Sequence, residues 1–182
     1  MAAIVASDIV FRYSTTAGAA GNTTAGAANT SLGKYISTTA WAGGSANDLF
    51  DDISGAENAA STVDYRCIFV YNSNGANAYQ NAVVYLSAEV AGGASIAVAV
   101  DSTAASALGS ASAQALQVAS ETTAPAGPLT FSSPTTAATG VSLGTIPSGQ
   151  VRAFWVRRTA ANSAALSNDG VTIAVSGDTG SL

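Results

Sequence analysis

The sequence predicts an all-β protein: an antiparallel β-sandwich, of immunoglobulin-like or jelly-roll topology, with an extended N-terminal arm. Three observations predict this fold class. Short runs of alternating apolar and polar residues recur along the chain, turn-forming Gly, Asn and Pro separate them, and amphipathic helical periodicity is almost absent. The pattern fits both topologies equally well. At 182 residues the chain suits one domain of ordinary size.

Residues 1–47 are expected to form the arm, with one short strand inside it. That strand is "DIVFRYS", in which Ile9, Phe11 and Tyr13 share one side of an extended chain. Residues 17–29 are small, uncharged and aperiodic, so burying them offsets little of the entropy lost when they become ordered. We therefore expect the arm to gain order by lying against another surface.

Residues 48–182 are expected to form the sandwich itself. Its strands are predicted from the runs "STVDYRCIFVYN", "AVVYLSAEV", "ASIAVAV", "GVSLGTI", "QVRAFWVRRT" and "VTIAVSG". The first run becomes apolar on both faces in its second half, as in a central strand, whereas the last alternates and predicts a half-exposed strand. Residues 113–120 fit helix or strand, and the prolines within 122–136 predict a long crossing loop.

The densest acidic cluster lies within residues 47–61 and consists of Asp48, Asp51, Asp52 and Glu57. Its spacing differs from the alternate-position pattern of an EF-hand calcium loop, so we expect no metal site. We expect a helical turn instead, capped by Asn47 or Asp48 and ended by Gly55. Carboxylates so close in sequence are also more simply interpreted as a solvated turn than as a catalytic pair.

Composition argues against several function classes. The chain has no histidine, which removes the commonest general base and metal ligand, and Cys67 is its only cysteine. We expect a non-enzymatic protein without cofactors, in which Cys67 is a small buried hydrophobe. The net charge of -5 with six basic residues argues against nucleic acid as a partner. The N-terminus does not resemble a signal peptide, and no apolar run is long enough to cross a membrane.

The run "VRAFWVRRT", residues 151–159, concentrates aromatic and basic side chains. Alternation predicts Phe154 and Val156 facing the core, with arginines at its rims, and Trp155 on the outer face beside Arg157. Trp and Arg are enriched among interface anchors, so this face is predicted to contact another subunit. Two alternatives stay open: a loop of the same chain covers Trp155, or Trp155 is a carbohydrate platform. The candidate subunit or capsid contacts are Phe11, Trp41, Trp155 and Arg157.

Several segments resemble a family of small virion structural proteins of tailed bacteriophages. They are "DIVFRYS", "NDLFDDISGAENAASTVDYRCIFVYN", "LGTIPSGQVRAFWVRRT" and "VTIAVSGDT", which cover the beginning, the middle and the last third of the chain. The resemblance implies an architectural role on the outside of a capsid, in a sandwich-like and often trimeric protein. It carries over no catalytic residue.

The first functional hypothesis is accordingly a capsid decoration or stabilising protein located in the virion and made in the host cytoplasm. Its partner would be the major capsid protein or another virion protein, and a homotrimer is favoured. The alternatives are a component of the tail or neck, and a receptor-binding or carbohydrate-binding module.

Overall fold

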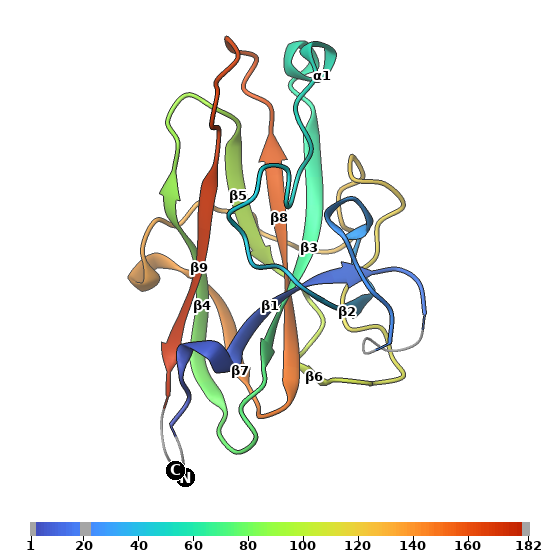
Figure 1. The fold of residues 1–182 in the computed structure, drawn as a ribbon, viewed down its shortest axis with the longest axis vertical. Coiled ribbons are helices and arrows are strands. Elements are labelled where there is room, and N and C mark those ends of the chain that lie inside the picture. The colour runs from blue at the N-terminus through green and yellow to red at the C-terminus, as the bar shows by residue number, and fades with distance from the viewer. Residues whose placement is uncertain (1–2, 19–22, 180–182) are drawn as a thin grey trace.

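The computed structural model describes residues 3–18 and 23–179, which form two antiparallel sheets packed as a sandwich (Figure 1). The six-stranded sheet has the order β2-β1-β3-β8-β5, with β6 also paired to β8, and the three-stranded sheet has the order β7-β4-β9. The strands are β1 (Ile9–Thr15), β2 (Tyr35–Ala40), β3 (Val63–Asn72), β4 (Tyr79–Glu89), β5 (Ser95–Val100), β6 (Ser106–Ala107), β7 (Val141–Ile146), β8 (Gln150–Thr159) and β9 (Val171–Asp178). The helical elements are α1 (Gly55–Ala60) and the 3-10 turns η1 (Ala6–Asp8), η2 (Ala28–Thr30) and η3 (Ala137–Thr139). The predicted fold class is confirmed.

The first core lies between the two sheets. The larger sheet contributes Ile68 and Val70 from β3 and Phe154 and Val156 from β8, all fully buried. The smaller sheet faces them with β4, and Val171, Ile173 and Val175 of β9 pack against the same core. The inward orientation predicted for Phe154 and Val156 is confirmed, as is the one-sided packing of the last strand.

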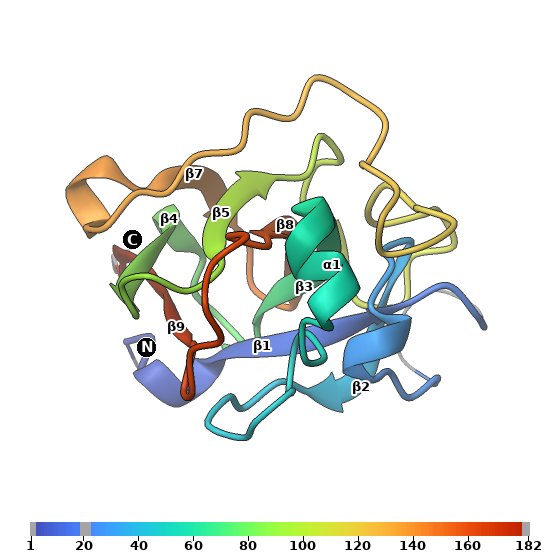
Figure 2. The same ribbon diagram turned by 90° about the horizontal axis from the view of Figure 1, so that it is seen from above.

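A second core lies on the other face of the larger sheet. The side chains that alternate with the first core on β3 and β8 are buried there, among them Cys67, Phe69, Ala153 and Trp155. The connection from β6 to β7 covers them with Leu108, Ala115, Val118, Leu129 and Phe131, and the β1–β2 connection and β2 add Leu32 and Ile36. Figure 2 shows this connection passing around the outside of β5 on its way to β7. Burial raises the pKa of the Cys67 thiol, so this side chain is the neutral buried hydrophobe that was predicted.

Asp101, at the end of β5, fixes this covering segment. Its carboxylate accepts hydrogen bonds from Trp155 Nε1 at 2.7 Å, from the Thr103 N–H at 2.7 Å and from the Leu116 N–H at 2.9 Å. Gln114 is also buried, and its side-chain oxygen accepts the Ile36 N–H at 3.2 Å. Because buried polar groups must be paired, these two side chains determine where an otherwise irregular chain can lie.

The structure does not confirm the predicted extended N-terminal arm. β1 pairs with β3 from Ile9 to Tyr13, across the predicted domain boundary after residue 47, and β2 pairs with β1. The connection between β1 and β2 is held by polar groups: the Ser31 hydroxyl donates to Cys67 O at 2.7 Å and accepts the Ser14 N–H at 2.8 Å. Residues 19–22 of the predicted aperiodic stretch 17–29 lie outside the described residues. Strand pairing and the hydrogen bonds of the Ser31 hydroxyl to main-chain groups therefore order a segment that has few bulky side chains.

The predicted helical turn is displaced along the chain. Asn47 and Asp48 do not cap it, and Gly55 begins α1 instead of ending a turn. Ser54 is the N-cap: its hydroxyl accepts the Glu57 N–H at 3.3 Å, while the Glu57 carboxylate accepts the Ser54 N–H at 2.7 Å. This reciprocal pair fixes the start of α1, and the residues before it form an irregular loop. Residues 113–120 contain no helix or named strand, and 122–136 form the predicted crossing loop.

The role of Asp101 predicts a stability change. Asp101→Asn replaces an acceptor oxygen with an NH₂ group that cannot accept the surrounding N–H donors, so we expect the free energy of unfolding to fall by about 1–3 kcal/mol. Asp178→Asn is the matched control, because the Asp178 side chain is exposed at the end of β9; its effect should stay within about 0.5 kcal/mol. Urea denaturation of both variants measures the difference. Equal stabilities for the two variants would contradict the account.

Candidate functional site

Trp155 and Arg157 do not form the exposed face that was predicted. Trp155 is 0% exposed, because the covering segment of the same chain packs on it; this is the alternative that the sequence left open. Arg157 lies over the ring of Phe131, with its guanidinium carbon 5.0 Å from the ring centroid. The direction predicted for Trp155 was right and its exposure was wrong, so Trp155 is unavailable as a surface contact in this fold.

Phe11 and Trp41 lie together, away from Trp155. Phe11 is partly buried against the first core and makes edge contacts with Trp41 and Phe154, at centroid distances of 5.7 and 6.1 Å. Trp41 follows β2 and is also only partly buried. Two of the predicted contact residues therefore share one region, and Trp41 lines a hollow in the described structure.

We call this hollow the apical cleft. It lies between residues 41–58 and residues 161–171, with Gly93 and Ala94 completing its wall, and its volume is about 750 Å³. Figure 1 shows α1 and the β8–β9 connection at the same end of the molecule, and Figure 2 shows them from above. The lining combines Trp41, Phe50, Ile53 and Leu166 with polar side chains, chiefly Asn47, Asp48, Asp51, Asp52, Asn58, Asn168 and Asp169.

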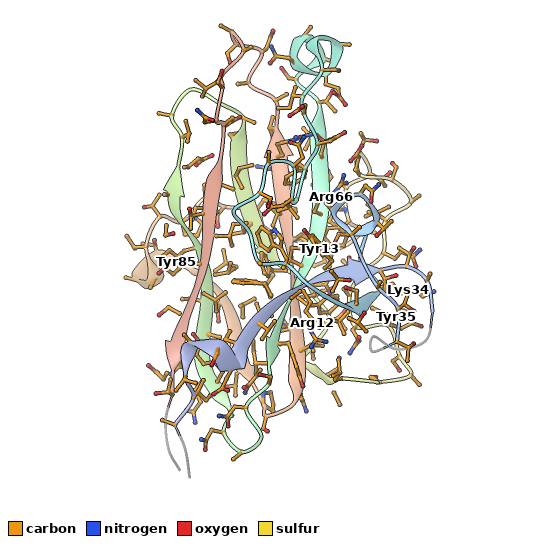
Figure 3. All side chains as sticks on the ribbon, viewed as in Figure 1. Arg12, Tyr13, Lys34, Tyr35, Arg66 and Tyr85 are labelled. Carbon is orange, nitrogen blue, oxygen red and sulfur yellow. The ribbon has the colours of Figure 1, made fainter. Side chains whose placement is uncertain are left out.

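An arginine clamp around Phe50 holds the 41–54 loop in place. The guanidinium carbons of Arg158 and Arg66 lie 4.8 and 5.5 Å from the Phe50 ring centroid. Arg66 Nε donates to Leu49 O at 3.2 Å, and Leu49 is buried in the first core. In Figure 3 Arg66 is labelled on the larger sheet beside this loop. The clamp fixes a loop that has no regular structure of its own.

Carboxylates neutralise both arginines of the clamp. Arg158 Nη2 lies 2.7 Å from Asp64 Oδ2 and 3.3 Å from Asp51 Oδ1, and Arg66 forms an ion pair with Glu121. Asp64 and Arg158 are directly opposite each other on β3 and β8, and both side chains are buried. Asp51 brings the cleft loop into the same network. A buried charge pair of this kind depends on each partner for its stability.

The Tyr13 side chain on β1 also holds the 41–54 loop in place. Its hydroxyl donates to the main-chain oxygen of Asp48, and Figure 3 shows Tyr13 labelled near the middle of the molecule, where β1 passes the loop. Burial raises the pKa of Tyr13, and the negative charge of Asp48 adds to the shift. The neutral phenol is therefore the form that the folded structure favours.

Hydrogen bonds between loops complete the cleft wall. Asp169 Oδ2 accepts the Ala94 N–H at 2.7 Å, and Asn58 Nδ2 donates to Ser163 O at 2.7 Å. Gly93 is close-packed here: an added Cβ would lie 2.0 Å from Asp169 Oδ1. The β4–β5 turn, α1 and the β8–β9 connection are thus linked into one wall.

Two residues of the cleft lining each have a buried polar atom without a hydrogen-bond partner among the described residues. These atoms are the indole nitrogen Nε1 of Trp41, a donor, and Oδ2 of Asp48, an acceptor, and both are shielded from bulk water. Across residues 3–18 and 23–179, no group of three or more His, Cys, Asp or Glu side chains is placed to hold a metal ion. The chemistry of the cleft is thus aromatic, amide and carboxylate.

Comparison with known proteins finds no matching family model, curated protein or solved structure. In the described part of the chain, no helix has the length and apolar character to span a membrane.

The arginine clamp predicts that substitutions of the adjacent residues Arg157 and Arg158 lower the free energy of unfolding by very different amounts. Arg158→Met leaves Asp64 buried without a partner and should lower the free energy of unfolding by about 3–5 kcal/mol. Arg157→Met loses a stacking contact at a half-buried site and should lower it by about 0.5–1 kcal/mol. Guanidinium denaturation of the two variants gives the comparison. Similar losses would show that the Asp64 pair is not the anchor of the loop.

The raised pKa of Tyr13 predicts an alkaline loss of stability. A tyrosine whose pKa is higher in the folded than in the unfolded state contributes stability that is complete below about pH 10 and is lost as the pH rises through the folded value. Tyr79 is shifted in the same direction, first by burial. Tyr13→Phe should flatten the decline without abolishing it, as measured by denaturation midpoints across this pH range. An unchanged slope would contradict the burial of the hydroxyl.

Proposed function

We propose that this chain is a non-enzymatic structural protein of a tailed-phage virion, bound to the outside of the head lattice as a decoration protein. The observation that carries the proposal is the charge-poor surface of the sandwich. Charged residues are 9% of the chain, and Asp64, Arg66, Asp101 and Arg158 among them are buried. Exposed connections are built of small uncharged residues, as in "AGGSAN" at 42–47 and "NSAALSN" at 162–168.

Such a surface suits permanent contact with neighbouring subunits. Small side chains lose little rotamer entropy when an interface forms, and few charges have to be desolvated. Soluble globular domains contain on average about 25% charged residues, against 9% in this chain. The scarcity of such residues here favours a component of an assembly.

The partner in this proposal is the major capsid protein or another virion protein, and the chain acts as a homotrimer. The resemblance of the strand-rich segments to virion structural proteins of tailed bacteriophages supports this class of partner. Trp155 is removed from the proposed contact residues because it is buried. Phe11, Trp41 and Arg157 retain partial exposure and remain proposed contacts.

The polar groups of the apical cleft support a binding role rather than a catalytic one. Asp51 is held by Arg158, and Asp169 accepts a main-chain N–H. Carboxylates engaged in this way position loops. A tail or neck component is the second location that the same surface would suit.

Electron cryomicroscopy of the intact particle tests the proposal. We expect sandwich-shaped density repeated on the outer surface of the head, in threefold clusters, and a trimer in light scattering of the purified protein. Because the surface is charge-poor, rebinding to stripped heads should change little between low and high salt. Density along the tail or neck would replace the decoration role with the alternative, and absence from the particle would overturn the proposal.

A further inference from the structure

We propose that the open edge of β9, formed by the main-chain groups of Val171, Ile173 and Val175, binds an extended peptide segment of a partner protein. The segment adds a strand to the smaller sheet, with lysine or arginine at its ends and apolar residues at alternate positions between them. This binding is a property of the chain itself and does not depend on attachment to a virion.

One side of β9 is bonded to β4, which is its only strand neighbour in the described part of the chain. Gly170 O accepts the Val90 N–H at 3.0 Å, and Thr172 O accepts the Ser87 hydroxyl at 3.3 Å; both donors belong to the β4 side. Main-chain groups of successive residues in a strand point to opposite sides. The even-numbered positions of β9 therefore face β4.

The odd-numbered positions of β9 face the other way. The N–H and C=O groups of Val171, Ile173 and Val175 point away from β4, and no second strand among the described residues bonds to them. Such a row of donors and acceptors is the template on which another strand pairs.

The outer edges of β5, β2 and β7 are covered or interrupted, unlike that of β9. Val98 of β5 exchanges two main-chain hydrogen bonds with Ser132 of the crossing loop. The Thr38 N–H of β2 donates to a main-chain oxygen of the β1–β2 connection at 2.9 Å, and β7 is interrupted by Gly144 at φ 74°. Charged residues and proline also protect sheet edges, and residues 171–177 contain neither. The open edge of β9 is thus suited to pairing.

Apolar side chains flank the open edge. Val171, Ile173 and Val175 pack against the first core and are only partly buried, and so are Ile9 and Phe11 of β1. Figure 2 shows β1 and β9 at the same side of the sandwich, although they belong to different sheets. A strand added to β9 directs every second side chain to this side of its sheet, which favours apolar residues at alternate positions.

Charge favours basic ends for the added strand. Asp169 precedes β9 and Asp178 ends it, and both side chains are exposed. Each carboxylate uses Oδ2 in a hydrogen bond within the chain and can accept further bonds. All six Lys and Arg residues lie on β1, β3 or β8 or in the β1–β2 connection, so the smaller sheet offers these carboxylates no cation. A basic residue near each end of the partner segment supplies it.

A second copy of the chain fits the open edge less well. If two β9 strands paired antiparallel with Ile173 opposite Val175, the Asp178 of each copy would lie next to the Asp169 of the other. Like charges so placed oppose the pairing, whereas a segment with basic ends is attracted by both carboxylates.

Peptide binding measured by fluorescence anisotropy tests the partner chemistry. The probe is a labelled octapeptide in which threonine and valine alternate between two terminal lysines, and its matched control has glutamate at both ends. We expect saturable binding of the lysine peptide that weakens as salt is added, and binding of the glutamate peptide that is weaker by about tenfold or more. If neither peptide binds, or if both bind equally, the proposal is wrong.

Two substitutions at one position test the main-chain contact. Val175→Pro and Val175→Ala both remove the valine side chain from the first core, but only proline also removes the outward N–H. We expect Val175→Ala to retain most of the affinity for the lysine peptide and Val175→Pro to lose about tenfold or more. Equal affinities of the two variants would overturn the proposal.

Amide hydrogen exchange of the unaltered chain guards against poor folding of Val175→Pro. In the free chain the Ile173 and Val175 N–H groups should exchange faster than those of Thr172 and Ala174, which face β4, and the lysine peptide should slow their exchange. Slow exchange of Ile173 and Val175 in a free monomer would show that the edge is already covered. A dimer in light scattering, with these groups protected and no peptide bound, would overturn the proposal in favour of a second copy.

Discussion

The burial of β3 and β8 on both faces is the constraint on which the rest of the structure depends. Consecutive residues of β8 serve different cores: Phe154 lies between the sheets and Trp155 lies under the covering segment, both without exposed surface. A chain with only 7% aromatic residues places several of them on this one strand pair. The irregular segment that follows β6 must therefore lie over the outer face, and Asp101 and Gln114 fix its path.

Alternation of residue types was enough to predict the strands, because each strand of a sandwich has an inner face that must be apolar. It also gave the right direction for Phe154 and Trp155. The exposure of Trp155 could not be predicted, since the segment that covers it has no periodic pattern and is held by individual side chains. The capping pair of Ser54 and Glu57 was visible as S-x-x-E and would have placed α1 correctly.

The order of the N-terminal segment and the cleft were also hard to predict, because both depend on contacts of individual side chains. Ser31 looks like an ordinary loop residue, yet its hydroxyl accepts the Ser14 N–H of β1 and donates to Cys67 O of β3. Asp64 and Arg158 form a pair only because β3 and β8 align them, and register between distant strands is not readable from one sequence. Trp41 was predicted as a contact residue together with the aperiodic arm that precedes it. The structure adds the cleft that it lines.

These features give a consistent physical account of the proposed roles. Most bulky side chains pack into the two cores or around Phe50, and four charged side chains, Asp64, Arg66, Asp101 and Arg158, are buried with them. Exposed connections such as 42–47 and 162–168 are built of small uncharged residues. Such an exterior suits packing in a lattice, while the pre-formed cleft stays open at one end of the sandwich.

The burial of Trp155 is the point at which this account is most directly tested. In a Trp41→Phe variant, Trp155 is the only indole, and acrylamide quenching measures its accessibility. The account predicts emission typical of a buried indole and quenching that remains weak until the protein unfolds. Efficient quenching in the folded protein would show that the covering segment does not lie on β8, and the second core would have to be abandoned.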